Sequence, residues 1–78
     1  MITPEQIHEQ IAAIEYHLFD GTTMLACCIT LKNGYPVIGY AFTADPADFD
    51  INKIQQYAQD DAESKIAELL AYSLKGKL

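Results

Sequence analysis

The chain has 78 residues, half of them apolar, and carries eleven acidic residues against five lysines and no arginine. This length predicts a single domain over residues 1–78 with a small core. The formal net charge of −6 argues against a protein that binds the DNA or RNA backbone, which requires clustered positive charge. The longest fully apolar run, Met24 to Ile29, is far shorter than the roughly 20 residues of a membrane span.

The first ten residues carry no positive charge and no long apolar stretch, so we expect no signal peptide and a cytoplasmic protein. The two cysteines, Cys27 and Cys28, are adjacent in a predicted strand. Neighbours in a strand point to opposite faces and cannot easily bridge each other. We therefore expect reduced thiols, with a disulfide between two chains through one of them as the alternative.

The N-terminal segment predicts a helix that starts at Thr3-Pro4-Glu5-Gln6, since Thr3 can cap, Pro4 suits the first helical position and Gln6 completes a capping box. Isoleucines at positions 7, 11 and 14 follow at helical spacing, so the helix is expected to end near residue 14. Residues 15–19 then predict a short strand.

A hairpin is predicted from residues 22–32 and 35–43, joined by Asn33-Gly34 in a type I′ turn. The two-residue loop implies a register in which apolar residues face each other on one side of the sheet. The expected pairs are Leu31 with Pro36, Ile29 with Ile38, Cys27 with Tyr40, and Leu25 with Phe42. We expect this side to form the core under the last helix.

The opposite side of the predicted hairpin carries small or neutral residues and no charge before Lys32. Its members are Met24, Ala26, Cys28, Thr30, Val37, Gly39, Ala41 and Thr43. A sheet face exposed to water alternates with charged residues, so we expect something to cover this one. The prediction is a homo-oligomer that buries Ala26, Cys28, Val37 and Gly39, or a neighbouring stretch of helix one.

The segment from Asp45 to Asp50 predicts a loop in which Asp48 or Asp50 caps the last helix. Apolar residues then recur at three- and four-residue steps, which is typical of an amphipathic helix of about 20 residues. They are Ile51, Ile54, Ala58, Ala62, Ile66, Leu69 and Leu70. The predicted fold class is α+β, a single small α-β-β-β-α domain with a three-stranded antiparallel meander packed on a long C-terminal helix.

Motifs for catalysis are weak. His8 lacks the second histidine of a zinc-protease motif, and the spacing of the two histidines and two cysteines does not suit a metal site. Mid-strand apolar cysteines lack the helix N-terminus or neighbouring cation that activates a nucleophile. We expect no enzyme, no metal and no cofactor. Tyr35 beside Lys32, and Tyr57 on the last helix, could instead stack on a nucleobase near a phosphate, with ordinary packing as the alternative.

The order of several short motifs resembles a family of small tailed-phage proteins described as gene-49/gene-66-like, over about residues 14–74. The residues that carry the resemblance are Glu15-Tyr16-His17, Phe19, Thr22-Thr23, Cys27-Cys28-Ile29-Thr30-Leu31, Asn33-Gly34, Gly39, Asp45-Pro46-Ala47, Phe49-Asp50, Lys65-Ile66 and Tyr72. The family is associated with the type-one Thoeris anti-defence proteins. That resemblance implies a non-enzymatic oligomeric sponge that sequesters a cyclic nucleotide-derived immune signal.

The chain departs from the family pattern at one corner. Asp48 replaces the usual Asn before Phe49-Asp50, and Ile54-Gln55-Gln56 stands where the family carries Gly-Arg-Lys. A Trp-Pro pair later in the helix is replaced by Ala67-Glu68. The lost arginine and the gained aspartate both weaken a phosphate site there.

Two functions follow as expectations, with a structural or regulatory phage protein that has neither role as the third possibility. The first is a phage counter-defence protein that sequesters a small nucleotide-derived signal, with the ligand held by Asp48, Asp50, Lys53, Tyr57 and Lys32. The second is an acidic protein–protein inhibitor that occupies the basic groove of a host nucleic-acid-binding defence complex, which the net charge of −6 favours. Either way the partners are copies of the chain and a signal or host protein, with neither direct nucleic-acid binding nor a membrane.

Overall fold

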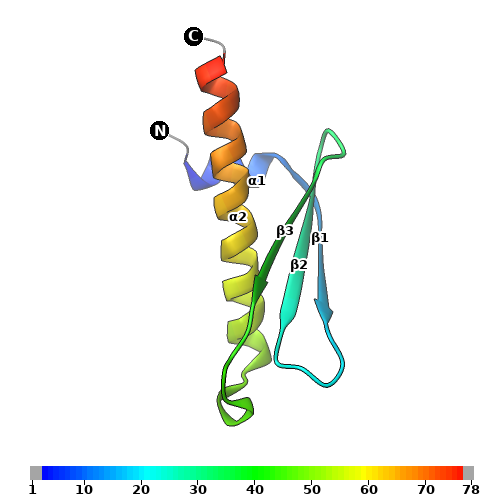
Figure 1. Cartoon of the computed structure of the whole chain (residues 1–78). Coiled ribbons are helices and arrows are strands. Elements are labelled where there is room, and N and C mark those ends of the chain that lie inside the picture. The colour runs from blue at the N-terminus through cyan, green and yellow to red at the C-terminus, as the bar shows by residue number, and fades with distance from the viewer. Residues whose placement is uncertain (1–2, 77–78) are drawn as a thin grey trace.

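The computed structural model describes residues 3–76, and the side chains of residues 3–72. Three strands form one antiparallel sheet in the order β1-β2-β3, preceded along the chain by the helix α1 and followed by the long helix α2 (Figure 1). The elements are α1 (Pro4–Glu9), β1 (Ile11–Leu18), β2 (Leu25–Leu31), β3 (Pro36–Ala41), the 3-10 turn η1 (Pro46–Asp48) and α2 (Ile51–Gly76). This confirms the predicted α+β architecture, with the meander packed on the long last helix.

The first helix begins as predicted but ends earlier. The Thr3 hydroxyl accepts the Gln6 N–H at 3.2 Å, and the Gln6 side chain accepts the Thr3 N–H at 2.8 Å, which completes the capping box. The helix stops at Glu9, and β1 already starts at Ile11. The prediction that the helix reaches residue 14 is therefore wrong.

A β-bulge explains the misleading spacing of Ile11 and Ile14. Ile11 pairs with Leu31 and Ile14 with Ile29, and the register shifts between Ile11 and Ala13. In a regular strand, residues three apart point to opposite faces, whereas an inserted residue returns them to the same face. The apparent helical spacing is thus produced by a strand with one extra residue.

The hairpin between β2 and β3 has a three-residue loop instead of the predicted two-residue one. The Gly34 N–H donates to the Leu31 carbonyl at 2.8 Å, and the Leu31 N–H donates to the Tyr35 carbonyl at 2.9 Å. Gly34 has a φ of +90°, while Asn33 does not adopt the positive φ that a type I′ turn demands. A type I turn closed by a glycine bulge fits this pattern.

The longer loop moves β3 by one residue relative to β2. Ile29 now faces Val37, and Cys27 faces Gly39. Because a one-residue slip reverses every side chain of a strand, the predicted core face is correct for β2 and wrong for β3. Ile38, Tyr40 and Phe42, expected under the helix, are instead 55%, 52% and 59% exposed.

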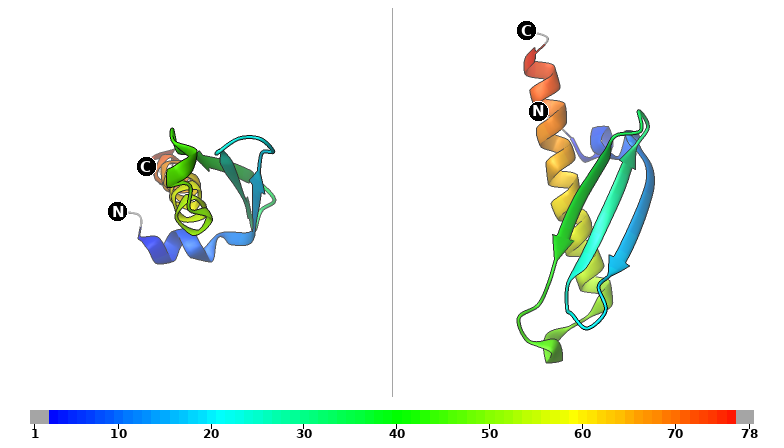
Figure 2. Two further views of the ribbon diagram at one scale, coloured as in Figure 1. Left: turned by 90° about the horizontal axis from the view of Figure 1, so that it is seen from below. Right: turned by 45° about the vertical axis from the view of Figure 1, so that its right-hand side comes forward.

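The core lies between α2 and the strands β2 and β3, while β1 is farther from the helix (Figure 2). Its buried members are Leu25, Cys27, Ile29, Leu31, Val37, Ile54, Ala58, Ala62 and Ile66. The apolar stripe of α2 is therefore as predicted at its centre, whereas Ile51 and Leu69 remain at the surface. Val37 and Gly39 meet α2 within one chain, so the prediction that they are buried between subunits is wrong.

Gly39 is the point of closest approach between β3 and α2. A Cβ atom at this position would lie 2.5 Å from the carbonyl oxygen of Ala58 and would also collide with the backbone of Ala62. The small residues on both elements allow the two backbones to pack directly against each other.

We expect Gly39→Ala to destabilise the protein by about 1–3 kcal/mol or more, because backbone atoms must move to accommodate the methyl group. Gly21→Ala is the control, since a Cβ there meets nothing within 4 Å and the cost is limited to its positive φ of +76°, about 1–2 kcal/mol. Urea denaturation of the two variants measures the difference. A Gly39→Ala protein as stable as wild type would contradict the close packing.

Candidate binding site

The outer edge of β3 is closed by side chains of α2. The N–H of Tyr40 donates to Oδ2 of Asp61 at 3.0 Å, and the carbonyl of Ile38 accepts from Nζ of Lys65 at 2.7 Å. Asp61 and Lys65 lie one helical turn apart, and Nζ of Lys65 is 3.4 Å from Oδ2 of Asp61. Pro36 on the same strand has no N–H that needs a partner. These helix side chains therefore satisfy an edge that would otherwise be free to pair.

Lys65 is held at this edge by several contacts. Besides the Ile38 carbonyl and the Asp61 carboxylate, its ammonium lies 5.5 Å from the centroid of the Tyr40 ring. An ammonium has three N–H donors, so one donor is left for a further acceptor. Its side chain is 42% exposed, which gives an outside anion access to that donor.

A surface groove of about 470 Å³ opens beside Lys65, between β3 and the C-terminal half of α2. We call it the β3–α2 groove; it is lined by Tyr35, Pro36, Val37, Ile38, Lys65, Glu68, Leu69 and Tyr72. Tyr35 and Tyr72 are 53% and 79% exposed. The groove thus combines two accessible aromatic rings, an apolar floor, one cation and one carboxylate.

The five residues predicted to bind a ligand lie at two ends of the sheet. Asp48 ends η1, Asp50 precedes α2, and Lys53 and Tyr57 are exposed on its first two turns. Lys32 is in the β2–β3 hairpin loop, at the opposite end of the sheet (Figure 1). Within one chain the structure therefore brings four of the five residues into one region and leaves the fifth apart.

Asp50 caps α2, as predicted for Asp48 or Asp50. Its Oδ1 accepts the N–H of Asn52 at 3.0 Å, and its carbonyl accepts the N–H of Ile54 at 2.9 Å. Asp45 does the same for η1, where its Oδ1 accepts the N–H of Ala47 at 2.9 Å. The Asp50 carboxylate already has a structural role, which a ligand contact would have to share.

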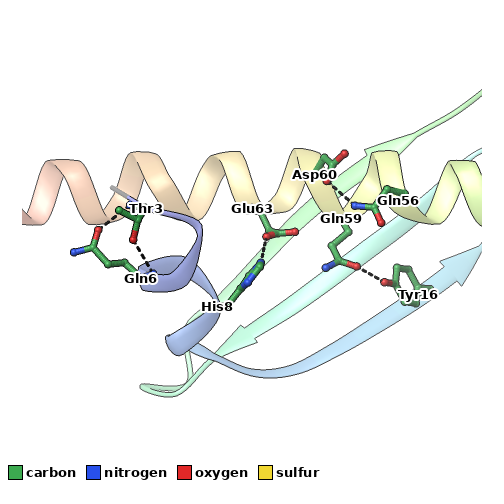
Figure 3. A network of polar contacts seen from close by, with 8 residues as sticks. All are labelled: Thr3, Gln6, His8, Tyr16, Gln56, Gln59, Asp60 and Glu63. Carbon is green, nitrogen blue, oxygen red and sulfur yellow. Dashed lines mark hydrogen bonds and ion pairs between the residues drawn. The ribbon is translucent and has the colours of Figure 1, made fainter. Parts of the chain in front are cut away.

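Polar contacts tie α1 and β1 to the face of α2 that looks toward them (Figure 3). His8 Nε2 lies 2.7 Å from Oε1 of Glu63, and the Tyr16 hydroxyl donates to Oε1 of Gln59 at 2.6 Å. Partial burial, with smaller contributions from nearby Cys27 and Glu63, raises the pKa of Tyr16. The phenol therefore stays protonated and available as this donor.

The uncovered side of the sheet has a shallow hollow lined by residues of all three strands. It has a volume of about 300 Å³, and Glu15, Tyr16, His17, Phe19, Ala26, Cys28 and Ile38 line it. The rings of His17 and Phe19 pack edge to face with their centroids 4.7 Å apart. Cys28 opens onto this side, while Cys27 is buried against α2.

The two thiols should differ in reactivity. Burial first, and then the neighbouring Cys28 and Glu63, raise the pKa of Cys27, so less of its reactive thiolate is present at a given pH. We expect iodoacetamide to modify one thiol per folded chain, at Cys28, as read by mass spectrometry. Cys28→Ser should abolish this labelling and Cys27→Ser should retain it. Equal labelling of both thiols in the folded protein would contradict the assignment.

The part of the chain that the structure describes contains neither a candidate metal site nor a membrane-spanning helix. Among residues 3–76, no group of three or more His, Cys, Asp or Glu side chains is placed to hold a metal ion. Likewise, no helix within the described residues is long and apolar enough to cross a membrane.

Sequence reasoning missed most of the β3–α2 groove. The sequence identifies Tyr35 as an aromatic residue that need not lie in the core, but it predicts no role for Lys65, Glu68 and Tyr72. Their spacing of three and four residues along α2 places them on one side of the helix and was the available signal. The wrong hairpin register hid the other wall, because it turned Ile38 inward.

The geometry defines a small α+β domain with an aromatic surface groove along one sheet edge. Residues 2–78 match the phage protein (N4 Gp49/phage Sf6 gene 66) family, and the chain belongs to this family. The resemblance noted for the sequence is thereby confirmed at the level of the phage family. No match is found among curated proteins or among solved structures.

Proposed function

We propose that this phage protein is a non-enzymatic binding protein that counters a bacterial defence by sequestering a small, cyclic nucleotide-derived signal in the cytoplasm of the infected cell. The observation that carries the proposal is the β3–α2 groove, which is lined by Lys65 together with two exposed tyrosines, Tyr35 and Tyr72. Membership in a phage protein family supports the phage setting. The resemblance to anti-defence sponges supports the choice of ligand class.

The groove has the chemistry that a nucleotide requires. Stacking of a base on an aromatic side chain contributes about 1–3 kcal/mol and tolerates any base. Tyr35 and Tyr72 offer ring faces for such stacking, and the remaining donor of Lys65 can reach a phosphate oxygen. Glu68 in the same groove limits the negative charge that it accepts, which favours a ligand with few phosphates.

A second location for the ligand is the start of α2, where Asp48, Asp50, Lys53 and Tyr57 lie. Lys53 is in the first turn of the helix, next to backbone N–H groups and the positive end of the helix dipole. Lys32 would have to come from another chain to join them. This site and the groove are distinguishable because each contains one exposed tyrosine of α2.

Tyr72→Ala and Tyr57→Ala form a matched pair of variants. Tyr72 is 79% and Tyr57 is 57% exposed, so neither substitution should change the melting temperature much. If the groove binds the signal, Tyr72→Ala should weaken binding about tenfold, the loss of one stacking contact, while Tyr57→Ala leaves it unchanged. Isothermal titration calorimetry against a panel of cyclic nucleotides and cyclic ADP-ribose isomers measures this.

The reverse result would move the site to the start of α2. In that case Lys53→Ala should also weaken binding by about tenfold or more, as the loss of a charge-assisted hydrogen bond predicts. If no member of the panel binds wild type, the sponge proposal fails.

The alternative function is an acidic inhibitor of a host nucleic-acid-binding defence complex. It is favoured by the separation of the described lysines, since Lys32, Lys53 and Lys65 lie in the hairpin loop, the first turn of α2 and the middle of α2. A sponge for an anion would gain from converging lysines, whereas an inhibitor needs exposed carboxylates. A pull-down against purified host nucleic-acid-binding defence complexes tests this function. Competition by DNA or RNA would support binding of the protein in the nucleic-acid groove of the host complex.

A further inference from the structure

The two edges of the sheet differ in how their backbone groups are satisfied. At the β3 edge, Asp61 and Lys65 engage the N–H of Tyr40 and the carbonyl of Ile38. Just after β1, the N–H of Phe19 donates to the Met24 carbonyl at 3.2 Å. Every second residue from Phe19 back to Ala13 therefore directs its backbone N–H and C=O groups toward β2. The residues between them, Ile14, Tyr16 and Leu18, direct their N–H and C=O groups away from the sheet. Within residues 3–76, these outward-pointing backbone groups have no hydrogen-bond partner.

The side chains of the same three residues form an incompletely covered apolar strip. Ile14, Tyr16 and Leu18 lie on the face of the sheet that α2 covers, but β1 is the strand farthest from α2 (Figure 2). They are 37%, 40% and 40% exposed. An open edge flanked by exposed apolar side chains is a template for pairing with another strand.

We propose that β1 pairs antiparallel with β1 of a second copy of this chain, about a twofold axis at Tyr16. In this register Ile14 lies opposite the partner's Leu18, and Tyr16 lies opposite the partner's Tyr16. All three outward-facing residues then form hydrogen-bonded pairs, each contributing two bonds, or about six across the interface. The two apolar strips merge into one between the two α2 helices.

Polar side chains on the uncovered face select this register among its neighbours. It places Glu15 opposite the partner's His17 on the uncovered side of the sheet, and the twofold axis repeats this pair. If the twofold axis moves by one residue, to Glu15 or to His17, Glu15 lies opposite the partner's Glu15, or His17 lies opposite the partner's His17. A Glu15–His17 pair can share a hydrogen bond, whereas two carboxylates opposite each other destabilise a cross-strand pair, so the register centred on Tyr16 is preferred.

The assembly should close at two chains. The same surface is used by both copies, which is the isologous contact of a twofold dimer. The remaining edges are the two β3 strands, which α2 already blocks through Asp61 and Lys65. The open edge of β1 therefore leads to a dimer with one continuous sheet, and growth into a fibre has no free edge to use.

Ile14→Lys tests the interface, with Ile38→Lys as its matched control. Ile14 is 37% exposed on the β1 strip, and Ile38 is 55% exposed on the uncovered side of the sheet. Wild type should have about twice the 8.7 kDa chain mass in sedimentation at high concentration. Ile14→Lys should raise the dimer dissociation constant about tenfold or more, because it buries a charge at the interface, and Ile38→Lys should leave it unchanged. Circular dichroism verifies that both variants fold.

A wild-type mass of 8.7 kDa at the highest soluble concentration would overturn the proposal. Dissociation by Ile38→Lys but not by Ile14→Lys would also overturn it, and would place the contact on the uncovered sheet face. Dimerisation through β1 needs no ligand, so its outcome is separate from that of the nucleotide titration.

A charge swap tests the register. His17→Glu alone should weaken the dimer, because it places two carboxylates opposite each other on both sides of the twofold axis. Glu15→Lys combined with His17→Glu places opposite charges against each other in the proposed register and should recover most of the affinity. If the double variant is as weak as His17→Glu, β1 does not pair about Tyr16.

Discussion

The length of the β2–β3 hairpin loop determines which side of β3 meets the long helix. Gly34 takes a positive φ of +90° and Asn33 does not, so the loop has three residues and sets Gly39 opposite Cys27 and Val37 opposite Ile29. Gly39 then meets the backbone of α2 at Ala58 and Ala62, closer than any side chain would permit. A two-residue loop would turn Ile38 and Tyr40 toward the helix instead, and their bulk would force β3 and α2 apart. The close packing of β3 on α2 therefore depends on this register.

The close packing of β3 on α2 also determines the character of the two sheet edges. Because α2 runs beside β3, Asp61 and Lys65 reach its outward backbone groups and take the place of a fourth strand. The same closeness leaves β1 only partly covered by the helix, with Ile14, Tyr16 and Leu18 37–40% exposed. The outward backbone groups of β3 therefore have hydrogen-bond partners on α2, whereas those of β1 have none within residues 3–76. The β3–α2 groove forms where the β3 edge meets the helix.

The sequence predicts the element order, the first helix cap, the inward face of β2 and the apolar stripe of α2, because these depend on local spacing and capping chemistry. It fails where non-local packing decides. Asn33-Gly34 is compatible with two loop lengths, and the contact of Gly39 with α2 selects the longer one. Ile11 and Ile14 match a helix until pairing with β2 introduces a bulge. The groove could not be predicted, since its walls join Ile38 to Lys65 across that same misassigned register.

In a dimer centred on β1, the two β3–α2 grooves lie at the outer ends of the joined sheet. Each groove must then bind its ligand with residues of a single chain, and Lys65 is the cation that lines it. In a protein of net charge −6, one partly engaged ammonium attracts an anion only weakly. The affinity of this groove for a nucleotide would therefore depend more on stacking against Tyr35 and Tyr72 than on charge, and it should vary little with salt, since few counterions are released.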